Sequence, residues 1–207
     1  MPMRPASLPR LLFLLSPAAL AALPGIAAAS RPAPDTHRAT GADSAASLTP
    51  ITLAPGVNPM PDIAGTDQDG SIAQLWRQNN KIRGQHVFLV KVGDASATLE
   101  GRESIIDAPD VGDDMIRSVR FARGNHEGRT TLYMLIASRD VEKSPYKAAT
   151  THIQSFALVR NHEGFAFTPV RAFVPAAKYC HADAALLAEL NFPLSPTYAG
   201  RVTPTGC

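Results

Sequence analysis

Apolar residues recur at every second position along most of the chain from Ile51 onward, and this alternation limits the fold more than any other feature of the sequence. A period of two places successive side chains on opposite faces of a β-strand. Together with flanking Gly, Pro and Asn, it predicts strands over 51–53, 72–76, 85–92, 115–122, 130–137, 152–160 and 165–174, with weaker segments at Leu99 and 105–106. We therefore expect a mainly β fold, an antiparallel sheet or sandwich of hairpins.

Two of these hairpins contain the same turn sequence, Asn-His-Glu-Gly, at 125–128 and at 161–164. Asn and Gly tolerate left-handed backbone, so one shared turn type explains the repetition. Pro169 lies inside the last predicted strand. Because Pro cannot donate a ladder hydrogen bond, we expect a bulge or a sheet edge there.

The C-terminal part is predicted to form one short helix followed by an irregular tail. Asp183 suits the N-cap, the helix ends near Asn191, and one face carries Leu186, Leu187 and Leu190. The two cysteines of the chain are Cys180 and Cys207. In an oxidising compartment such a pair predicts one disulfide, which pins the tail and contributes about 3.5 kcal/mol in the chain-entropy model.

Residues 1–29 have the pattern of a secretory signal peptide: two arginines, a short apolar stretch and a closing run of alanines. The apolar run is short for a bilayer span, so a retained anchor is the less favoured alternative. Residues 30–50 lack periodicity and predict a disordered tether, and residues 51–207 predict a single β-rich domain. We expect a bacterial protein that is periplasmic or secreted, without stable membrane insertion after cleavage.

The charge balance argues against polyanionic partners. Loss of the two arginines in residues 1–29 reduces Lys+Arg from 20 to 18, which equals the 18 Asp+Glu. No basic block remains that would favour nucleic acid or an anionic membrane surface. We therefore expect no nucleic-acid partner.

Two groups of residues have the ligand types of metal sites. Asp67 and Asp69, in the turn Asp-Gln-Asp-Gly-Ser, resemble half of a calcium loop but lack its distal Glu, so a plain turn is favoured. The second group would suit zinc if the two Asn-His-Glu-Gly turns met; it consists of His126, Glu127, His162 and Glu163. Nothing in the sequence fixes that approach, and we predict no metal or cofactor.

Ser144-Pro145-Tyr146-Lys147 matches the S-x-x-K motif of serine β-lactamases and penicillin-binding proteins. That motif needs the Ser at the start of a buried helix, whereas here it lies in a polar link between two predicted strands. The companion motifs S-D-N and K-T-G are absent from the sequence. We therefore expect a protein that is not an enzyme, with a serine hydrolase using Ser144 and Lys147 as a minor alternative.

The remaining polar cluster lies around the only Trp of the chain and comprises Trp76, Arg77, Asn79, Asn80 and His86. Arg offers a rigid donor fork for carboxylates, Asn offers donors and acceptors, and Trp offers a flat apolar wall. Together these side chains would hold a small anionic ligand. The alternative is a turn between strands with a core Trp and a surface Arg.

The order of short elements in this part of the chain resembles the carbapenem intrinsic-resistance (CarG-like) family. The elements are Leu53-x-Pro55-Gly56-x-Asn58, Asp62-Ile63, Asp69-Gly70, Arg77-x-Asn79-Asn80 and His86, together with a late cysteine at Cys180. They cover about a quarter of the mature chain. The sequence departs from the family pattern at Gln74, Asn79 and Gln85.

The resemblance implies a periplasmic, largely β protein that protects the cell from a carbapenem-type β-lactam without being a recognised β-lactamase. It would sequester the drug or shield the drug's targets. On this hypothesis Arg77 pairs with the drug carboxylate. The alternative is an immunity or inhibitor protein whose partner is a protein toxin or a wall enzyme; a homodimer is compatible with either function.

Overall fold

The computed structural model describes residues 47–78, 84–106, 116–140, 144 and 147–194. The predicted signal peptide and nearly all of the predicted tether lie outside these residues, as does Cys207. Within the described part no helix is long and apolar enough to cross a membrane.

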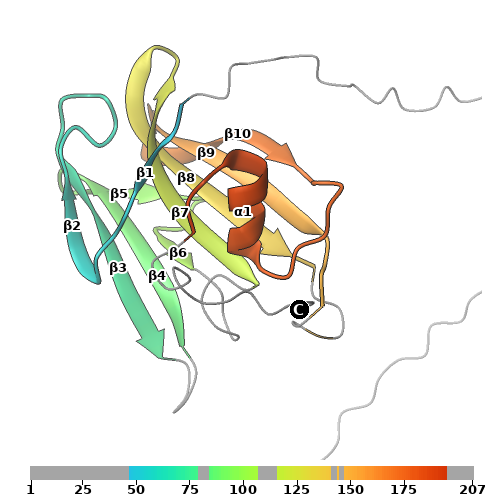
Figure 1. Cartoon of the computed structure of the whole chain (residues 1–207). Coiled ribbons are helices and arrows are strands. Elements are labelled where there is room, and N and C mark those ends of the chain that lie inside the picture. Colours follow the sequence, from blue (N-terminus) through green and yellow to red (C-terminus); the bar gives the residue numbers. More distant parts are fainter. Residues whose placement is uncertain (1–46, 79–83, 107–115, 141–143, 145–146, 195–207) are drawn as a thin grey trace, which may run out of the picture. The chain divides into compact units, whose positions relative to one another are not determined.

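The described chain is mainly β, as predicted, with one short helix near its C-terminal end (Figure 1). The helix is α1 (Ala182–Leu190), and the strands are β1 (Thr49–Ile51), β2 (Gly56–Met60), β3 (Gly70–Gln78), β4 (Gly84–Val92), β5 (Ala95–Thr98), β6 (Ser104–Ile106), β7 (Arg117–His126), β8 (Arg129–Arg139), β9 (Thr151–Asn161) and β10 (Gly164–Phe173). Each predicted strand overlaps an observed one, with shifted bounds: β1 begins at Thr49, inside the predicted tether, and shares only Ile51 with the predicted strand over 51–53. Strand β2 was not predicted.

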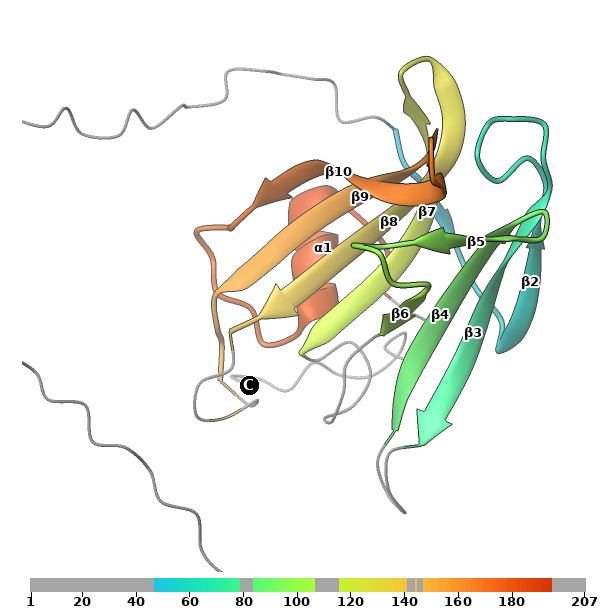
Figure 2. The same cartoon turned by 180° about the vertical axis from the view of Figure 1, so that it is seen from behind.

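The strands form one continuous sheet in the order β1-β7-β8-β9-β10-β5-β4-β3-β2, with β6 paired to β4. All neighbours are antiparallel except β10 and β5, which pair in parallel at Phe165↔Ala97 and Ala166↔Thr98. At this short parallel seam the sheet curls, so that it forms a half-barrel (Figure 2). The predicted purely antiparallel sheet and the alternative of a sandwich are therefore wrong in topology, because one mixed sheet folds over onto itself.

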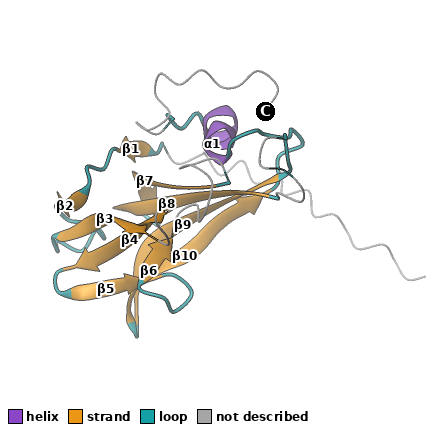
Figure 3. Cartoon of the chain, turned by 90° about the horizontal axis from the view of Figure 1, so that it is seen from below, coloured by secondary structure: helices purple, strands orange, loops and turns teal. Residues whose placement is uncertain are grey.

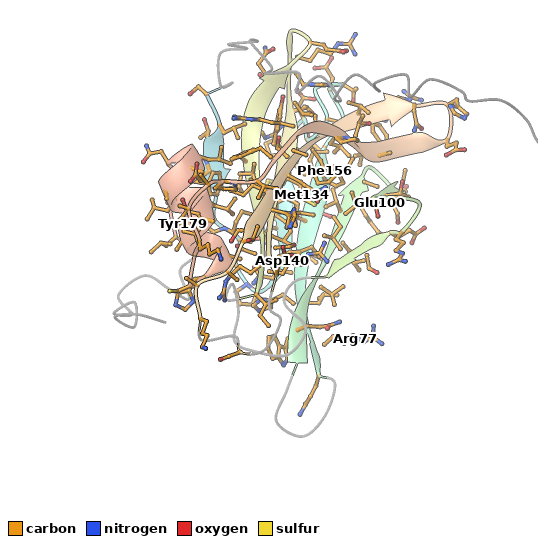
Figure 4. The ribbon with its side chains drawn as sticks, turned by 90° about the vertical axis from the view of Figure 1, so that its right-hand side faces the viewer. Arg77, Glu100, Met134, Asp140, Phe156 and Tyr179 are labelled. Atoms are coloured by element: carbon orange, nitrogen blue, oxygen red, sulfur yellow. The ribbon has the colours of Figure 1, made fainter. Side chains whose placement is uncertain are left out.

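The inner face of the curl contains the larger core. Alternation along the central strands places Phe121, Met134 and Phe156 on this face, where each is at most 5% exposed. Phe88 on β4 meets Phe121 from the facing half of the sheet, with ring centroids 5.3 Å apart. Figure 4 shows Met134 and Phe156 side by side in this interior. The two halves of the sheet are thus held together by apolar burial across the curl.

A second core lies on the outer face of β7, β8 and β9, where helix α1 packs (Figure 3). Alanine and leucine side chains of the helix meet the sheet there, and Leu186 is fully buried. The predicted helix is confirmed, and it ends at Asn191 in the left-handed conformation with φ 51°. Its N-cap is His181 rather than Asp183, and Leu187 is 40% exposed, so the predicted apolar face was wrong at that position.

The two Asn-His-Glu-Gly turns differ in register. In the first, the two-residue loop is Glu127-Gly128, and both residues have positive φ, at 51° and 81°. In the second, Asn161 pairs with Gly164 and the loop is His162-Glu163. One shared turn type was therefore the wrong explanation for the repeated sequence. The bulge predicted at Pro169 is confirmed by a register shift between Pro169 and Arg171.

Candidate functional site

Trp76 and His86 form a pair at one end of the half-barrel. They face each other across β3 and β4, with ring centroids 5.0 Å apart in an edge-on arrangement. Trp76 is 56% exposed although it lies on the inner face, in line with the buried Ile72. The Trp ring covers Gly84, where an added Cβ would lie 2.5 Å from a ring atom. The indole therefore packs closely on the Gly84 backbone while much of the residue stays exposed.

A row of rings connects this exposed pair to the core. His86 lies 6.2 Å from Phe88, ring centroid to centroid, and Phe88 lies 5.3 Å from Phe121. The row follows from the alternation along β4, since His86 and Phe88 are two residues apart. An apolar ring stacked on Trp76 would therefore continue the row of aromatic side chains on the inner face of the sheet.

Arg77 lies on the opposite face of β3 from Trp76, because consecutive residues of a strand point to opposite sides. Its cross-strand neighbour is Gln85, and its side chain is exposed. Figure 4 shows Arg77 projecting outward near the end of this strand. The structure thus brings together Trp76 and His86 from the predicted cluster and separates Arg77 from them. Asn79 and Asn80 lie outside the described residues.

The carboxylates around the predicted calcium turn are used to fix the backbone. Asp62 Oδ1 accepts hydrogen bonds from the N–H groups of Thr66 and Asp67, each at 2.8 Å. Asp69 Oδ1 accepts one from the N–H of Asp62 at 3.1 Å. Asp67 has a φ of 56°, as a tight turn requires. In this arrangement Asp62 and Asp69 stabilise the loop between β2 and β3, which is longer than the favoured plain Asp-Gly turn.

The His and Glu residues of the two Asn-His-Glu-Gly turns are not assembled as a metal site. Over the part of the chain that the structure describes, no group of three or more His, Cys, Asp or Glu side chains is placed to hold an ion. His126 instead contacts Tyr133, and His162 lies 3.6 Å from Glu163 at an exposed turn. The turns remain exposed polar tips.

Ser144 and Lys147 line a pocket of about 260 Å³ together with Asp140, Lys178 and the segment 148–150. Neither residue lies in a helix, so the structural setting of the S-x-x-K nucleophile is missing. Asp140 Oδ2 is 2.9 Å from His152 Nε2 in the same region. The S-x-x-K pattern identified Ser144 and Lys147. It missed Asp140 and Lys178, because neither belongs to a recognisable motif and Lys178 is far from Ser144 in the sequence.

A buried charged cluster joins helix α1 to the sheet. Asp183 is fully buried and accepts hydrogen bonds from Ser118 Oγ at 2.9 Å and from the Arg120 guanidinium at 3.2 Å. The same guanidinium lies 5.6 Å from the centre of the Phe192 ring. A buried charge is tolerated only when it is paired and hydrogen-bonded, and both conditions hold here. This cluster locks the helix at one position on the sheet.

Two ionisable groups near the helix have altered pKa values. Burial lowers the pKa of His181, the nearby Arg139 lowers it further, and Asp183 opposes the shift. Burial and the neighbouring Glu189 carboxylate, to which the hydroxyl donates a hydrogen bond, raise the pKa of Tyr179 to about 12. Both effects favour the neutral forms at neutral pH.

No family model matches the chain, and no curated protein matches it in sequence. Among solved structures, the fold is similar to that in the crystal structure of CarG, with a TM-score of 0.55 and 14% sequence identity over 77% of this chain and 98% of that chain. At this identity the similarity shows a shared fold. The CarG-like architecture expected from the N-terminal elements is therefore confirmed at the level of the fold.

Proposed function

We propose that this is an exported, non-enzymatic protein that protects a bacterial cell against a carbapenem-type β-lactam by binding the drug at the Trp76–His86 pair. The observation that carries the proposal is an exposed indole, packed on Gly84 and edge-on to a histidine, on the inner face of a sheet whose fold is similar to that of CarG. Of the ordered sequence elements that resemble the CarG-like family, Gly70, Arg77 and His86 lie on the same two strands.

The geometry supports a ligand contact at His86 rather than at Arg77. A ring stacked on Trp76 would lie next to the imidazole of His86, which can donate a hydrogen bond to a carbonyl or carboxylate oxygen. Arg77 is on the other face of the strand, so it does not pair with a ligand in that position. This replaces the earlier hypothesis, in which Arg77 held the drug carboxylate, with one in which His86 does.

The experiment titrates the purified protein with a carbapenem and follows Trp76, the single Trp, by fluorescence, with calorimetry for the variants. His86→Ala should weaken binding by about tenfold, since one hydrogen bond to a charged group is lost. Arg77→Ala is the matched control on the opposite face and should bind as the unaltered protein does. Equal effects of the two substitutions, or no binding at all, would overturn the assignment.

Protection is tested separately in cells. Export of the protein in a sensitive strain should raise carbapenem tolerance while the drug in the medium stays chemically intact. Loss of the drug would instead favour hydrolysis, and Ser144→Ala would then show whether the Ser144–Lys147 pocket is responsible. Cell fractionation of the same strain checks the proposed periplasmic location. Tolerance without measurable drug binding would favour shielding of the drug's targets.

A protein partner is the second candidate, and one observation favours it. The outer face of β2 and β3 exposes Val57 at 69% and Leu75 at 42%. Val57 pairs with Ala73, and Leu75 is the next residue of β3 on that face. Apolar side chains gathered on one face of a sheet are typical of contact surfaces. Recovery of a stoichiometric protein from periplasmic extract, lost in a Leu75→Ser variant, would support the immunity or inhibitor function over drug binding.

A further inference from the structure

The pocket beside the β8–β9 link has a cationic rim that the proposed drug site does not use. Lys147 and Lys178 both line it; Lys147 lies in the segment before β9, and Lys178 lies in the segment after β10. Across the residues that the structure describes, the ion pairs involve neither lysine. Two lysines thus line one small volume, and neither forms an ion pair with a described carboxylate.

The positions of these lysines are fixed by the backbone that carries them. Ala149 and Tyr179 form an isolated bridge, in which each N–H donates to the other residue's carbonyl at 3.0 Å. Arg139 is 5% exposed and donates from Nε to the Tyr179 carbonyl at 2.8 Å and from its terminal nitrogen to the Lys147 carbonyl. One buried guanidinium therefore ties both lysine-bearing segments together, which makes the pocket a constructed feature rather than a gap between loops.

The electrostatic balance of the pocket favours an anion. Among the described lining residues the negative charge is Asp140, whose Oδ2 lies 2.9 Å from His152 Nε2. Ser144 and Thr150 add hydroxyl groups to the lining. A partly enclosed site lined by two lysines and two hydroxyl-bearing residues has the composition that suits carboxylate and phosphate ligands.

We propose that this pocket binds a compact organic anion with one carboxylate or phosphate group, held between Lys147 and Lys178. Its volume of about 260 Å³ is just below the range of drug-sized sites, so the ligand is small. The site shares no residue with the Trp76–His86 pair. The anion-site proposal can therefore be tested independently of the proposed drug binding.

The test titrates the full chain with succinate and, separately, with inorganic phosphate, at low salt, by calorimetry and by NMR. Lys147→Gln and Lys178→Gln should each lower affinity by about fivefold, and Lys→Arg at either position should retain most of it. Lys91→Gln is the matched control, because Lys91 is an exposed lysine on β4 that does not line the pocket. The stronger of the two probes identifies the anionic group.

Three results would overturn the proposal. One is that neither probe binds at millimolar concentration. Another is that both Gln variants bind as the unaltered protein does. The third is that Lys91→Gln weakens binding as much as they do, which would indicate attraction by surface charge alone. Thermal melts of each variant show that it is folded before its affinity is interpreted.

Discussion

At the scale of single residues, the carboxylate of Asp183 has the most demanding position in the described chain. It is fully buried between helix and sheet and is bonded to Ser118 and Arg120. Local rules placed it at the N-cap, because an Asp before an apolar run satisfies free backbone N–H groups. The long-range bonds to β7 decided its place instead. The signal that would have revealed them is the pair of polar residues inside the apolar run of that strand.

Removal of the Asp183 carboxylate should destabilise the protein strongly. Asp183→Ala leaves the Arg120 guanidinium buried without its counter-ion, and we expect a loss of about 3–5 kcal/mol in the free energy of unfolding. Urea titration measures it. Glu189→Ala, on the same helix but at an exposed bond to Tyr179, is the control and should cost about 1 kcal/mol or less. A similar loss of unfolding free energy in both variants would mean that the buried ion pair contributes no more to stability than the exposed hydrogen bond does.

His181 should make stability depend on pH. Its folded-state pKa lies below the ordinary value of 6.5, so below pH 6.5 the unfolded chain binds protons that the folded chain does not. Stability from this group is therefore complete above pH 6.5 and declines as the pH falls below it. Unfolding free energies measured from pH 8 to pH 5 should fall less steeply for His181→Gln than for the unaltered protein. Parallel curves would exclude this role for His181.

At the scale of elements, the β3–β4 hairpin shows why the structure brings together only part of the predicted ligand cluster. Trp76 and Arg77 are adjacent in the sequence, and His86 pairs with Trp76 across the two strands. The sequence prediction placed all three in one ligand site. The alternation that identified these strands also sends Arg77 to the opposite face, so the separation followed from the sequence itself once the strands were accepted. The register of His86 against Trp76 depended on the loop between the strands, whose length alone does not determine it.

Gly84→Ala should disturb the indole site without disrupting the sheet. The new methyl group would lie 2.5 Å from the Trp76 ring, which must therefore move. We expect a shift in Trp emission, weaker carbapenem binding and a stability loss of about 1–3 kcal/mol. Gly101→Ala is the control: its added methyl contacts nothing within 4 Å, but its φ of 76° makes it strained. It should destabilise the protein and leave the emission spectrum unchanged; a matching spectral shift would contradict the assignment.

At the scale of the whole molecule, strand positions and fold class were predictable, and the topology was not. Alternation identifies strands and turn residues identify hairpins, because both are local properties. The curl depends on a parallel seam of two residue pairs between β5 and β10, and no local pattern in Ala97-Thr98 or Phe165-Ala166 indicates that pairing. Strand β2 was missed because Pro55-Gly56 and Pro59 suggest a turn, although Asn58 holds it by side-chain bonds to Ala54 and Ile72.

The predicted Cys180–Cys207 disulfide remains a prediction, since Cys207 lies outside the described residues. Denatured protein that has not been reduced should react with no thiol reagent, and reduction should release two thiols. Reduction should also lower the free energy of unfolding by about 3.5 kcal/mol, because the unfolded chain gains the freedom that the link removes. Cys207→Ser should reproduce that loss. Two reactive thiols before reduction would disprove the link.

The order of the strands also bears on how quickly the chain reaches this structure. Nearly all pairings join strands that follow one another closely, but β1 with β7 and β5 with β10 join segments far apart in the sequence. Long loops must close before these two pairings add stability, and such non-local contacts slow folding. The hairpins are therefore expected to form first, with the parallel seam among the last contacts. If the chain is exported in extended form, as proposed, it would be exposed to self-association until that seam closes.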